Sequence, residues 1–282
     1  MKIASYSVRD IPTFGAIVDD GVIDLPPRLG GRFGSLRELL TADGIGLARA
    51  AIAGIRADRP RKAVKMLPVV PDPDKIICAG VNYHAHAEET GRDVPTRPSM
   101  FLRMRSTLLA DGEAMRRPRN SVAFDFEGEL AVIIGKAGRL ISAADALSHV
   151  AGYCCFVDGS VRDYQKFSVT AGKNFHATGP LGPWMVTADE ILDPSALALT
   201  TRLNGTVMQH SGVDRLIHSV PELIAFASEF TTLLPGDVIA TGTPEGVGHR
   251  RTPPLWMKPG DQLEVEISKI GVLYSPIEDE QA

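Results

Sequence analysis

The sequence has little cysteine and no long apolar run. Its 282 residues include three cysteines, Cys78, Cys154 and Cys155, and the adjacent pair has the spacing of neither a zinc site nor an ordinary disulfide. We expect reduced thiols that pack as small hydrophobic side chains. No apolar run approaches the roughly 18 residues that a membrane span needs. The start MKIASYSVRDI also lacks the apolar core and cleavage site of a secretory signal, so we expect a cytoplasmic protein without membrane association.

An excess of one charge sign is also missing. Charged residues make up 23% of the chain and the net charge is −4, which gives no electrostatic reason to expect nucleic-acid binding. Basic residues gather between Arg97 and Arg119, but turns and apolar residues interrupt them. We interpret this stretch as a solvated surface, with an anion-binding rim as the alternative.

The first 70 residues differ in pattern from the rest. Asp20-Gly21 lies between two short apolar runs and predicts a hairpin turn. Apolar positions predict a helix from about residue 35 to 55. The stretch that follows, RADRPRKAVKMLPVVPDPDK, is charged and rich in proline and marks a boundary near residue 70. We therefore predict a small N-terminal α+β domain over 1–70 and a larger domain over 71–282.

Short strand-like segments dominate the larger domain. Hairpin turns are predicted at Asn204-Gly205 and at 269–271. Ser142 and Ser219, each with an acidic residue three positions later, mark the starts of two helices. Many strands with few helices predict a mainly β fold with antiparallel or mixed sheets. The strand-like segments are KIICAGV, SMFLRM, VAFDFEGELAVII, GYCCFVD, LALTTRLNG, DVIATGT and DQLEVEI.

The segment AFDFEGELAVIIG, residues 123–135, carries an acid at every second position. Alternation along a strand would place Asp125, Glu127 and Glu129 on one face, where like charges repel. A solvated strand face would tolerate them, but the run that follows is apolar, and Asp158 ends another apolar strand. Buried carboxylates need a counter-charge, and an all-oxygen donor set suits Mg²⁺ or Mn²⁺, with Ca²⁺ possible, better than zinc. We predict a metal site at Glu127, Glu129 and Asp158.

The segment GVNYHAHAEETG, residues 80–91, holds a candidate general base. His86 and Glu89 lie three residues apart, which on a helix places them within reach of each other. A carboxylate that orients an imidazole produces a base able to activate water. Two alternatives are an ordinary helix with surface His and Glu, and a cupin-like strand with His84 and His86 as metal ligands. Alanine and glutamate favour the helix, and a second cupin segment after Pro235-Gly236 is missing.

Polar residues follow the proposed ligand Asp158. Arg162, Gln165 and Lys173 offer cations and an amide donor, which a bound carboxylate or enolate would require, although each alone is more often a surface residue. The glycine-rich segment ATGTPEGVG, residues 240–248, lacks the ending of a phosphate-binding loop. Its threonines and backbone N–H groups are suited to a small anion.

These segments together resemble the fumarylacetoacetate hydrolase family. GVNYHAHAEE, DFEGELAVIIGK, GYCCFVDGSVRDYQ, LGPW, LNG, LPGDVIATGTPEGVG and KPGDQLEVEISKIG occur in the family's order, from about residue 72 to the end. The resemblance implies a mixed β-sandwich roll with a divalent metal at the opening of the sheet, and usually a homodimer. Residues 1–70 resemble the small, variable N-terminal domain of many members.

The resemblance also implies roles for single residues. Glu127, Glu129 and Asp158 match the metal ligands, and His86 with Glu89 matches the water-activating pair on a lid. The residues that match positions holding the substrate carboxylate or stabilising an enolate are Arg162, Gln165, Lys173 and Thr243.

The resulting hypothesis is metal-dependent hydrolysis of a carbon–carbon bond in an acylpyruvate, a 2,4-dioxo acid, as in the catabolism of aromatic compounds. The alternative is an isomerase or decarboxylase of the hydroxymuconate or oxaloacetate type, which uses the same enolate chemistry. A non-enzymatic, carboxylate-binding β protein would leave the matched polar clusters unexplained. For the acyl group, we expect the lid around 84–98 to matter. Arg103 and Arg105 share a face of a predicted strand, which we interpret as solvated, with a dicarboxylate-binding patch as the alternative.

Overall fold

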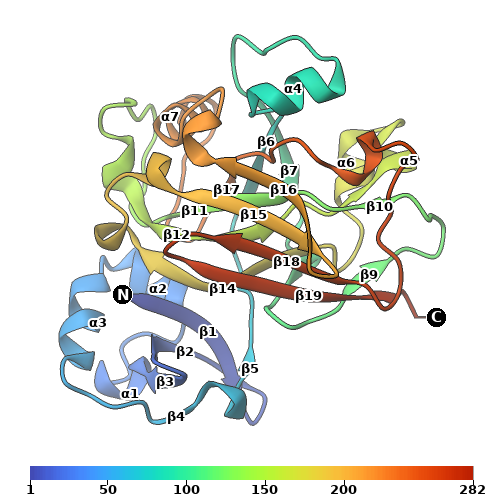
Figure 1. The fold of residues 1–282 in the computed structure, drawn as a ribbon. Coiled ribbons are helices and arrows are strands. Elements are labelled where there is room, and N and C mark those ends of the chain that lie inside the picture. The colour runs from blue at the N-terminus through green and yellow to red at the C-terminus, as the bar shows by residue number, and fades with distance from the viewer. Residues whose placement is uncertain (282) are drawn as a thin grey trace.

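A computed structural model describes residues 1–281, and its largest element is a twelve-stranded sheet (Figure 1). The strand order is β4-β3-β2-β1-β14-β12-β11-β17-β6-β7, with β5 paired to β1 and β8 to β14. Most pairs are antiparallel, whereas β17 with β6 and β8 with β14 are parallel. The strands are β1 (Lys2–Val8), β2 (Ile11–Val18), β3 (Gly21–Asp24), β4 (Arg59–Pro60), β5 (Lys65–Met66), β6 (Ile76–Gly80), β7 (Ser99–Arg103), β8 (Leu108–Leu109), β11 (Gly128–Ile134), β12 (Val150–Val157), β14 (Gly179–Thr187) and β17 (Val238–Ala240).

A five-stranded sheet packs against the middle of the large one, with the order β16-β15-β18-β19-β9. Side chains such as Leu130 and Tyr153 from the large sheet and Leu199 and Val265 from the smaller one form a single buried core. This sandwich confirms the predicted mainly β, mixed fold. The remaining strands are β9 (Met115–Arg117), β15 (Ala198–Leu203), β16 (Thr206–Gly212), β18 (Gln262–Ile267) and β19 (Gly271–Asp279), and a two-stranded ribbon of β10 (Phe124–Asp125) and β13 (Ser160–Val161).

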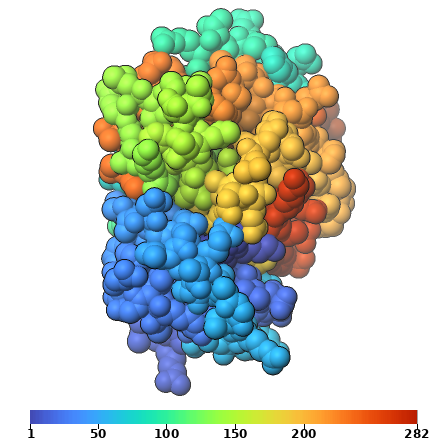
Figure 2. Space-filling view, turned by 90° about the vertical axis from the view of Figure 1, so that its left-hand side faces the viewer, coloured from blue at the N-terminus to red at the C-terminus, as the bar shows by residue number. Residues whose placement is uncertain are grey.

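The N-terminal residues form one end of the molecule (Figure 2). Their first strand continues the large sheet, because β1 pairs with β14 through Lys2 opposite Val186. The predicted hairpin is present, but its loop is Asp19-Asp20, one residue earlier than expected, since Val18 pairs with Gly21. The division into domains near residue 70 stays a prediction.

The predicted helix over 35–55 is wrong as a single element. The chain forms α1 (Leu25–Arg28), α2 (Leu36–Thr41) and α3 (Ile45–Ile52), and the last two are separated by a turn at 42–44. Asp43 adopts a φ of 52° there, which a continuing right-handed helix does not allow.

The larger part of the chain holds few helices, as predicted. Ser219 caps α7 (Val220–Phe230) with Glu222 in the expected capping box. The helix predicted from Ser142 is reduced to a short 3₁₀ turn, η3 (Ala146–His149). The other helices are α4 (His84–Thr90), α5 (Arg162–Gln165) and α6 (Val169–Lys173), and the other 3₁₀ turns are η1 (Arg61–Ala63), η2 (Arg105–Thr107), η4 (Ala188–Glu190), η5 (Pro194–Ala196), η6 (Val213–Arg215) and η7 (Gly248–Arg250). None of the helices in residues 1–281 is long and apolar enough to cross a bilayer.

Candidate active site

The acidic segment that we predicted as one strand is divided between two sheets. Phe124 and Asp125 form β10 and pair with β13, whereas Gly128 begins β11 in the large sheet. The chain passes from one sheet to the other at residues 126–127. Asp125 is fully buried, and it lies against Arg162 instead of on a solvated face.

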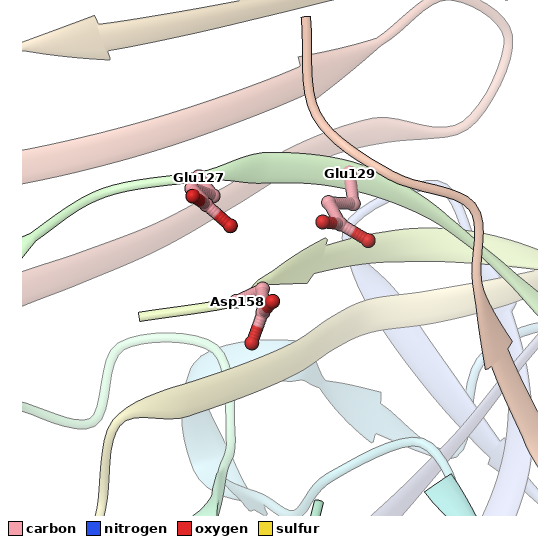
Figure 3. Close-up of side chains that lie close together, drawn as sticks. All are labelled: Glu127, Glu129 and Asp158. Atoms are coloured by element: carbon pink, nitrogen blue, oxygen red, sulfur yellow. The ribbon is translucent and has the colours of Figure 1, made fainter. Parts of the chain in front are cut away.

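Three carboxylates converge where β11 begins and β12 ends (Figure 3). Glu127, Glu129 and Asp158 each offer an oxygen atom within 4.8 Å of the others. All three side chains are buried, with exposed fractions of 5%, 1% and 1%. The structure therefore brings together the three residues predicted to bind a metal.

Each carboxylate in this cluster has one oxygen held by a donor of its own. The other oxygens of Glu127 and Asp158 accept from Lys173. The second oxygen of Glu129 accepts no hydrogen bond within residues 1–281. The three donors are Arg162 Nη2 to Glu127 Oε1 at 2.5 Å, the Gly242 N–H to Glu129 Oε2 at 2.9 Å, and Arg103 Nη1 to Asp158 Oδ1 at 2.5 Å.

Lys173 lies between two of the carboxylates. Its Nζ donates to Glu127 Oε2 and to Asp158 Oδ2, both at 2.5 Å. Burial lowers the pKa of Lys173, but these two carboxylates outweigh burial and raise the pKa above its ordinary value. The ammonium therefore remains charged at the floor of the site.

The pKa values of the two glutamates of the cluster are shifted in opposite directions. Burial raises the pKa of Glu127, but Arg162 and Lys173 outweigh burial and hold that pKa well below its ordinary range. Burial raises the pKa of Glu129 as well, and the carboxylates of Asp158 and Glu127 push it further upward. Burial and the two neighbouring carboxylates therefore both disfavour the ionised form of Glu129.

The residues present fit a hard divalent cation. All three groups are carboxylates that can each offer one oxygen, and one oxygen of the buried Glu129 has no hydrogen-bond partner within residues 1–281. Oxygen donors of this kind are the ligands of Mg²⁺, Mn²⁺ and Ca²⁺.

The predicted base lies above the cluster on a short helix. His84 to Thr90 form α4, which stands at one end of the molecule (Figure 1), so the cupin-like strand is excluded. His86 is buried and lines the same cavity as the carboxylates, whereas His84 is exposed. His86 Nδ1 lies 3.0 Å from Glu89 Oε2, and the Gly246 N–H donates to Glu89 Oε1 at 2.9 Å. Glu89 thus joins the helix to the glycine-rich loop.

The residues predicted to hold substrate also line this cavity, whose volume is about 230 Å³. Arg162 donates to Asp125, Glu127 and the side-chain oxygen of Gln165. Thr243 donates its hydroxyl to the Gly128 carbonyl and accepts from Gln209 Nε2. The cavity is lined by Ala79, Gly80, Val81, His86, Thr90, Arg92, Phe101, Glu127, Glu129, Asp158, Arg162, Gln165, Lys166, Lys173, Thr243, Val247, His249 and Arg250.

Sequence reasoning missed the role of Arg103. The sequence predicts Arg103 and Arg105 on one solvated face, but the Arg103 side chain is fully buried on Asp158, whereas Arg105 is exposed in η2. The available signal was an arginine inside an apolar strand, since such a charge is buried only when it is paired.

Comparison with known proteins identifies the family. The family profile described as fumarylacetoacetate (FAA) hydrolase C-terminal matches residues 75–278. The chain belongs to the fumarylacetoacetate hydrolase family. The predicted resemblance is therefore confirmed, and the chain is an enzyme of this superfamily with an acidic cluster suited to a divalent ion.

Three members of the family illustrate its range. Bovine oxaloacetate tautomerase FAHD2A, mitochondrial, is 40% identical over 237 residues, which are 83% of this chain and 76% of the relative. The structure of maleylpyruvate hydrolase from Sphingobium sp. SYK-6, with manganese(II) and pyruvate, is 30% identical with a TM-score of 0.85 over both full chains. That of 5-carboxymethyl-2-hydroxymuconate delta-isomerase from Mycobacterium smegmatis is 28% identical with a TM-score of 0.79, over 99% of this chain and 100% of the other. Fumarylacetoacetate hydrolase relatives thus include a tautomerase, a hydrolase and an isomerase.

Proposed function

We propose that this protein enolises a 2-oxo acid, and that tautomerisation of an oxaloacetate-type acid is its reaction. One observation carries the proposal: the buried His86, held by Glu89, faces the same cavity as Lys173 and the three-carboxylate cluster. A base, a cation and an anchor for the acid are the groups that enolisation requires. The oxaloacetate tautomerase at 40% identity supports the choice of tautomerisation.

Glu89 prepares His86 to accept a proton. A carboxylate only accepts hydrogen bonds, so the imidazole donates from Nδ1 and leaves Nε2 free as the base. When His86 becomes charged, the nearby carboxylate stabilises the imidazolium. The Gly246 N–H holds the other Glu89 oxygen, which fixes the orientation of the pair.

Lys173 and Arg162 supply positive charge where the enolate develops. A divalent ion at Glu127, Glu129 and Asp158 would supply Lewis-acid polarisation of the 2-oxo acid. Lys173, charged and buried against Glu127 and Asp158, would donate to the oxygen on which negative charge appears. Arg162 and Gln165 line the side of the cavity where the acid's carboxylate would bind.

Carbon–carbon hydrolysis of an acylpyruvate is the second candidate. The base of His86 can deprotonate a water molecule as well as a carbon acid, and the leaving group is again an enolate. The similarity to maleylpyruvate hydrolase, at 30% identity, supports this reaction. Decarboxylation is less well supported, because it gives the His86–Glu89 pair no task. A cytoplasmic homodimer that uses Mg²⁺ or Mn²⁺ stays a prediction.

Exchange of the C3 protons of a 2-oxo acid for deuterium tests enolisation directly. We expect Mg²⁺-dependent exchange by proton NMR, and His86→Gln should slow it by about 10²–10⁴-fold. His84→Gln is the matched control, since His84 lies on the same helix but is exposed. The proposal fails if the wild-type protein shows no metal-dependent exchange. Release of pyruvate and a carboxylic acid from an acylpyruvate would instead establish the hydrolase.

A further inference from the structure

Exposed basic side chains line the cavity that holds the carboxylate cluster. Arg92, Lys166 and Arg250 line it and are exposed. None of the three forms an ion pair within residues 1–281, whereas Arg97 and Arg116 do. The acidic side chains that line the cavity are Glu127, Glu129 and Asp158, which the structure gathers in the metal-type cluster. The cavity therefore runs from an acidic cluster to a basic rim.

Arg250 is held at this rim by a loop anchored inside the site. The N–H groups of Gly248 and His249 donate to the two oxygens of Asp125 at 2.8 and 3.1 Å. Asp125 accepts Arg162 Nε at 2.7 Å on the same carboxylate. A Cβ on Gly248 would lie 1.9 Å from the Leu255 carbonyl, so the loop can approach Asp125 only with glycine there. The backbone next to Arg250 is thus fixed relative to Arg162.

Arg250 also contacts the helix that carries the base. Its Nη2 donates to the carbonyl of Thr90, the last residue of α4, at 2.7 Å. The Glu89 contact with Gly246 is the other link between this helix and the glycine-rich segment. A guanidinium has five N–H donors, so Arg250 can hold Thr90 and still bind an anion.

We propose that Arg250 is a specificity-determining residue that binds the distal carboxylate of a 2-oxo dicarboxylic acid and, through Thr90, couples that binding to the position of His86. The inference rests on the proposed enolisation, in which a divalent ion held by the carboxylate cluster would anchor the 2-oxo acid end. One end of the substrate lies at this cluster, and the other end reaches the basic rim. Arg92 and Lys166 strengthen the rim by attracting the second negative charge.

The basic rim lies elsewhere than the alternative dicarboxylate-binding patch predicted at Arg103 and Arg105. Arg103 is committed to Asp158, and Arg105 does not line the cavity. A remote carboxylate that orders the helix bearing the base contributes to rate as well as to binding, because its binding energy positions the catalytic group. We therefore expect the preference for dicarboxylic over monocarboxylic acids to appear in kcat as well as in KM.

Matched acids that differ only in the distal group test the proposal. The pairs are oxaloacetate with 2-oxobutyrate and 2-oxoglutarate with 2-oxovalerate, each compared for affinity by calorimetry with Mg²⁺ present and for C3 exchange by NMR. Arg250→Gln should weaken binding of a dicarboxylate by about 10- to 100-fold, the range of one charge-assisted hydrogen-bonded contact. The affinity for the matched monocarboxylate should fall much less. Arg215→Gln, an exposed arginine outside the cavity, is the control and should keep the wild-type preference.

The outcomes separate this proposal from the function on which it rests. An equal loss of affinity for both acids of a pair would overturn the proposal, since Arg250 would then act only by holding Thr90. An unchanged preference in Arg250→Gln would also overturn it. If the wild-type protein exchanges no C3 protons, the proposed function fails, while the ratio of the two affinities still decides the role of Arg250.

Discussion

Replacing Arg103 with methionine tests whether a buried arginine positions a metal ligand. The side chain is fully buried, and all its donor nitrogens are used in contacts within β7 and its neighbours. Methionine removes the charge while keeping an unbranched apolar chain, so Asp158 loses the partner of its Oδ1 atom. The contacts of Arg103 are Nη1 with Asp158 Oδ1 and the Gly159 carbonyl, Nη2 with Thr178 Oγ1, and Nε with Thr107 Oγ1.

Two magnitudes follow from these contacts. Removing one partner of a buried ion pair costs about 3–5 kcal/mol, because the other charge remains buried. Lys173 still contacts Asp158, so we expect the lower half of that range for the free energy of unfolding in urea. Loss of a group that orients a metal ligand weakens metal affinity by about 10–100-fold. Calorimetric titration of folded Arg103→Met with Mn²⁺ measures that second effect separately from stability.

The neighbouring Arg105 supplies the control. It is exposed, so Arg105→Gln should change the free energy of unfolding by less than about 0.5 kcal/mol and leave the metal affinity as in the wild type. Arg103→Lys keeps the charge without the planar fork and should give an intermediate affinity. An unchanged Mn²⁺ affinity in Arg103→Met would refute the reasoning, since Asp158 would then be oriented without Arg103.

Three further predictions concern the loop at 248–249 and the carboxylate cluster. Burial, together with Arg162, lowers the pKa of His249, so the folded state binds a proton there less readily than the unfolded state. The free energy of unfolding should therefore fall as the pH falls below about 6.5. Urea titrations between about pH 7.5 and 5.5 should show this fall, and the fall should be smaller in His249→Gln. Mg²⁺ at about 100 times its dissociation constant should raise the free energy of unfolding by about 2.7 kcal/mol, and a chelator should reverse this. An equal response in Glu129→Gln would contradict the assigned cluster. Gly248→Ala should cost about 1–3 kcal/mol in unfolding free energy, because its Cβ meets the Leu255 carbonyl, and wild-type stability would contradict the loop's close approach.

Local sequence patterns correctly predicted the helix starts and turns that are stabilised by contacts between residues close in the chain. The capping box at Ser219 begins α7 because the cap satisfies backbone groups within its own first turn. Asn204-Gly205 forms the predicted hairpin loop, with φ of 52° and 77° at its two residues. Ser142 failed as a helix start, since its side chain bonds with Asp145 in a turn that does not continue as an α-helix.

At the site too, the sequence predicted the contacts that local spacing specifies. Residue types and spacing identified the carboxylates because acids in apolar strands require a counter-charge. They also placed His86 and Glu89 together, since that pair lies within one helical turn. Those side chains converge as predicted, although the strand that carries Asp125 proved to be separate from the strand that carries Glu129.

The sequence by itself thus determined the family, the mainly β fold and the acidic and imidazole groups of the site. Only the tertiary structure decided that Arg103 is buried on Asp158, 55 residues away along the chain, and that Arg250 reaches Thr90 across 160 residues. A period of two or of 3.6 residues tells which side chains share a face of one element, but not which element packs against that face. Sheet order and loop anchoring set those distant neighbours, and with them the distribution of charge along the cavity.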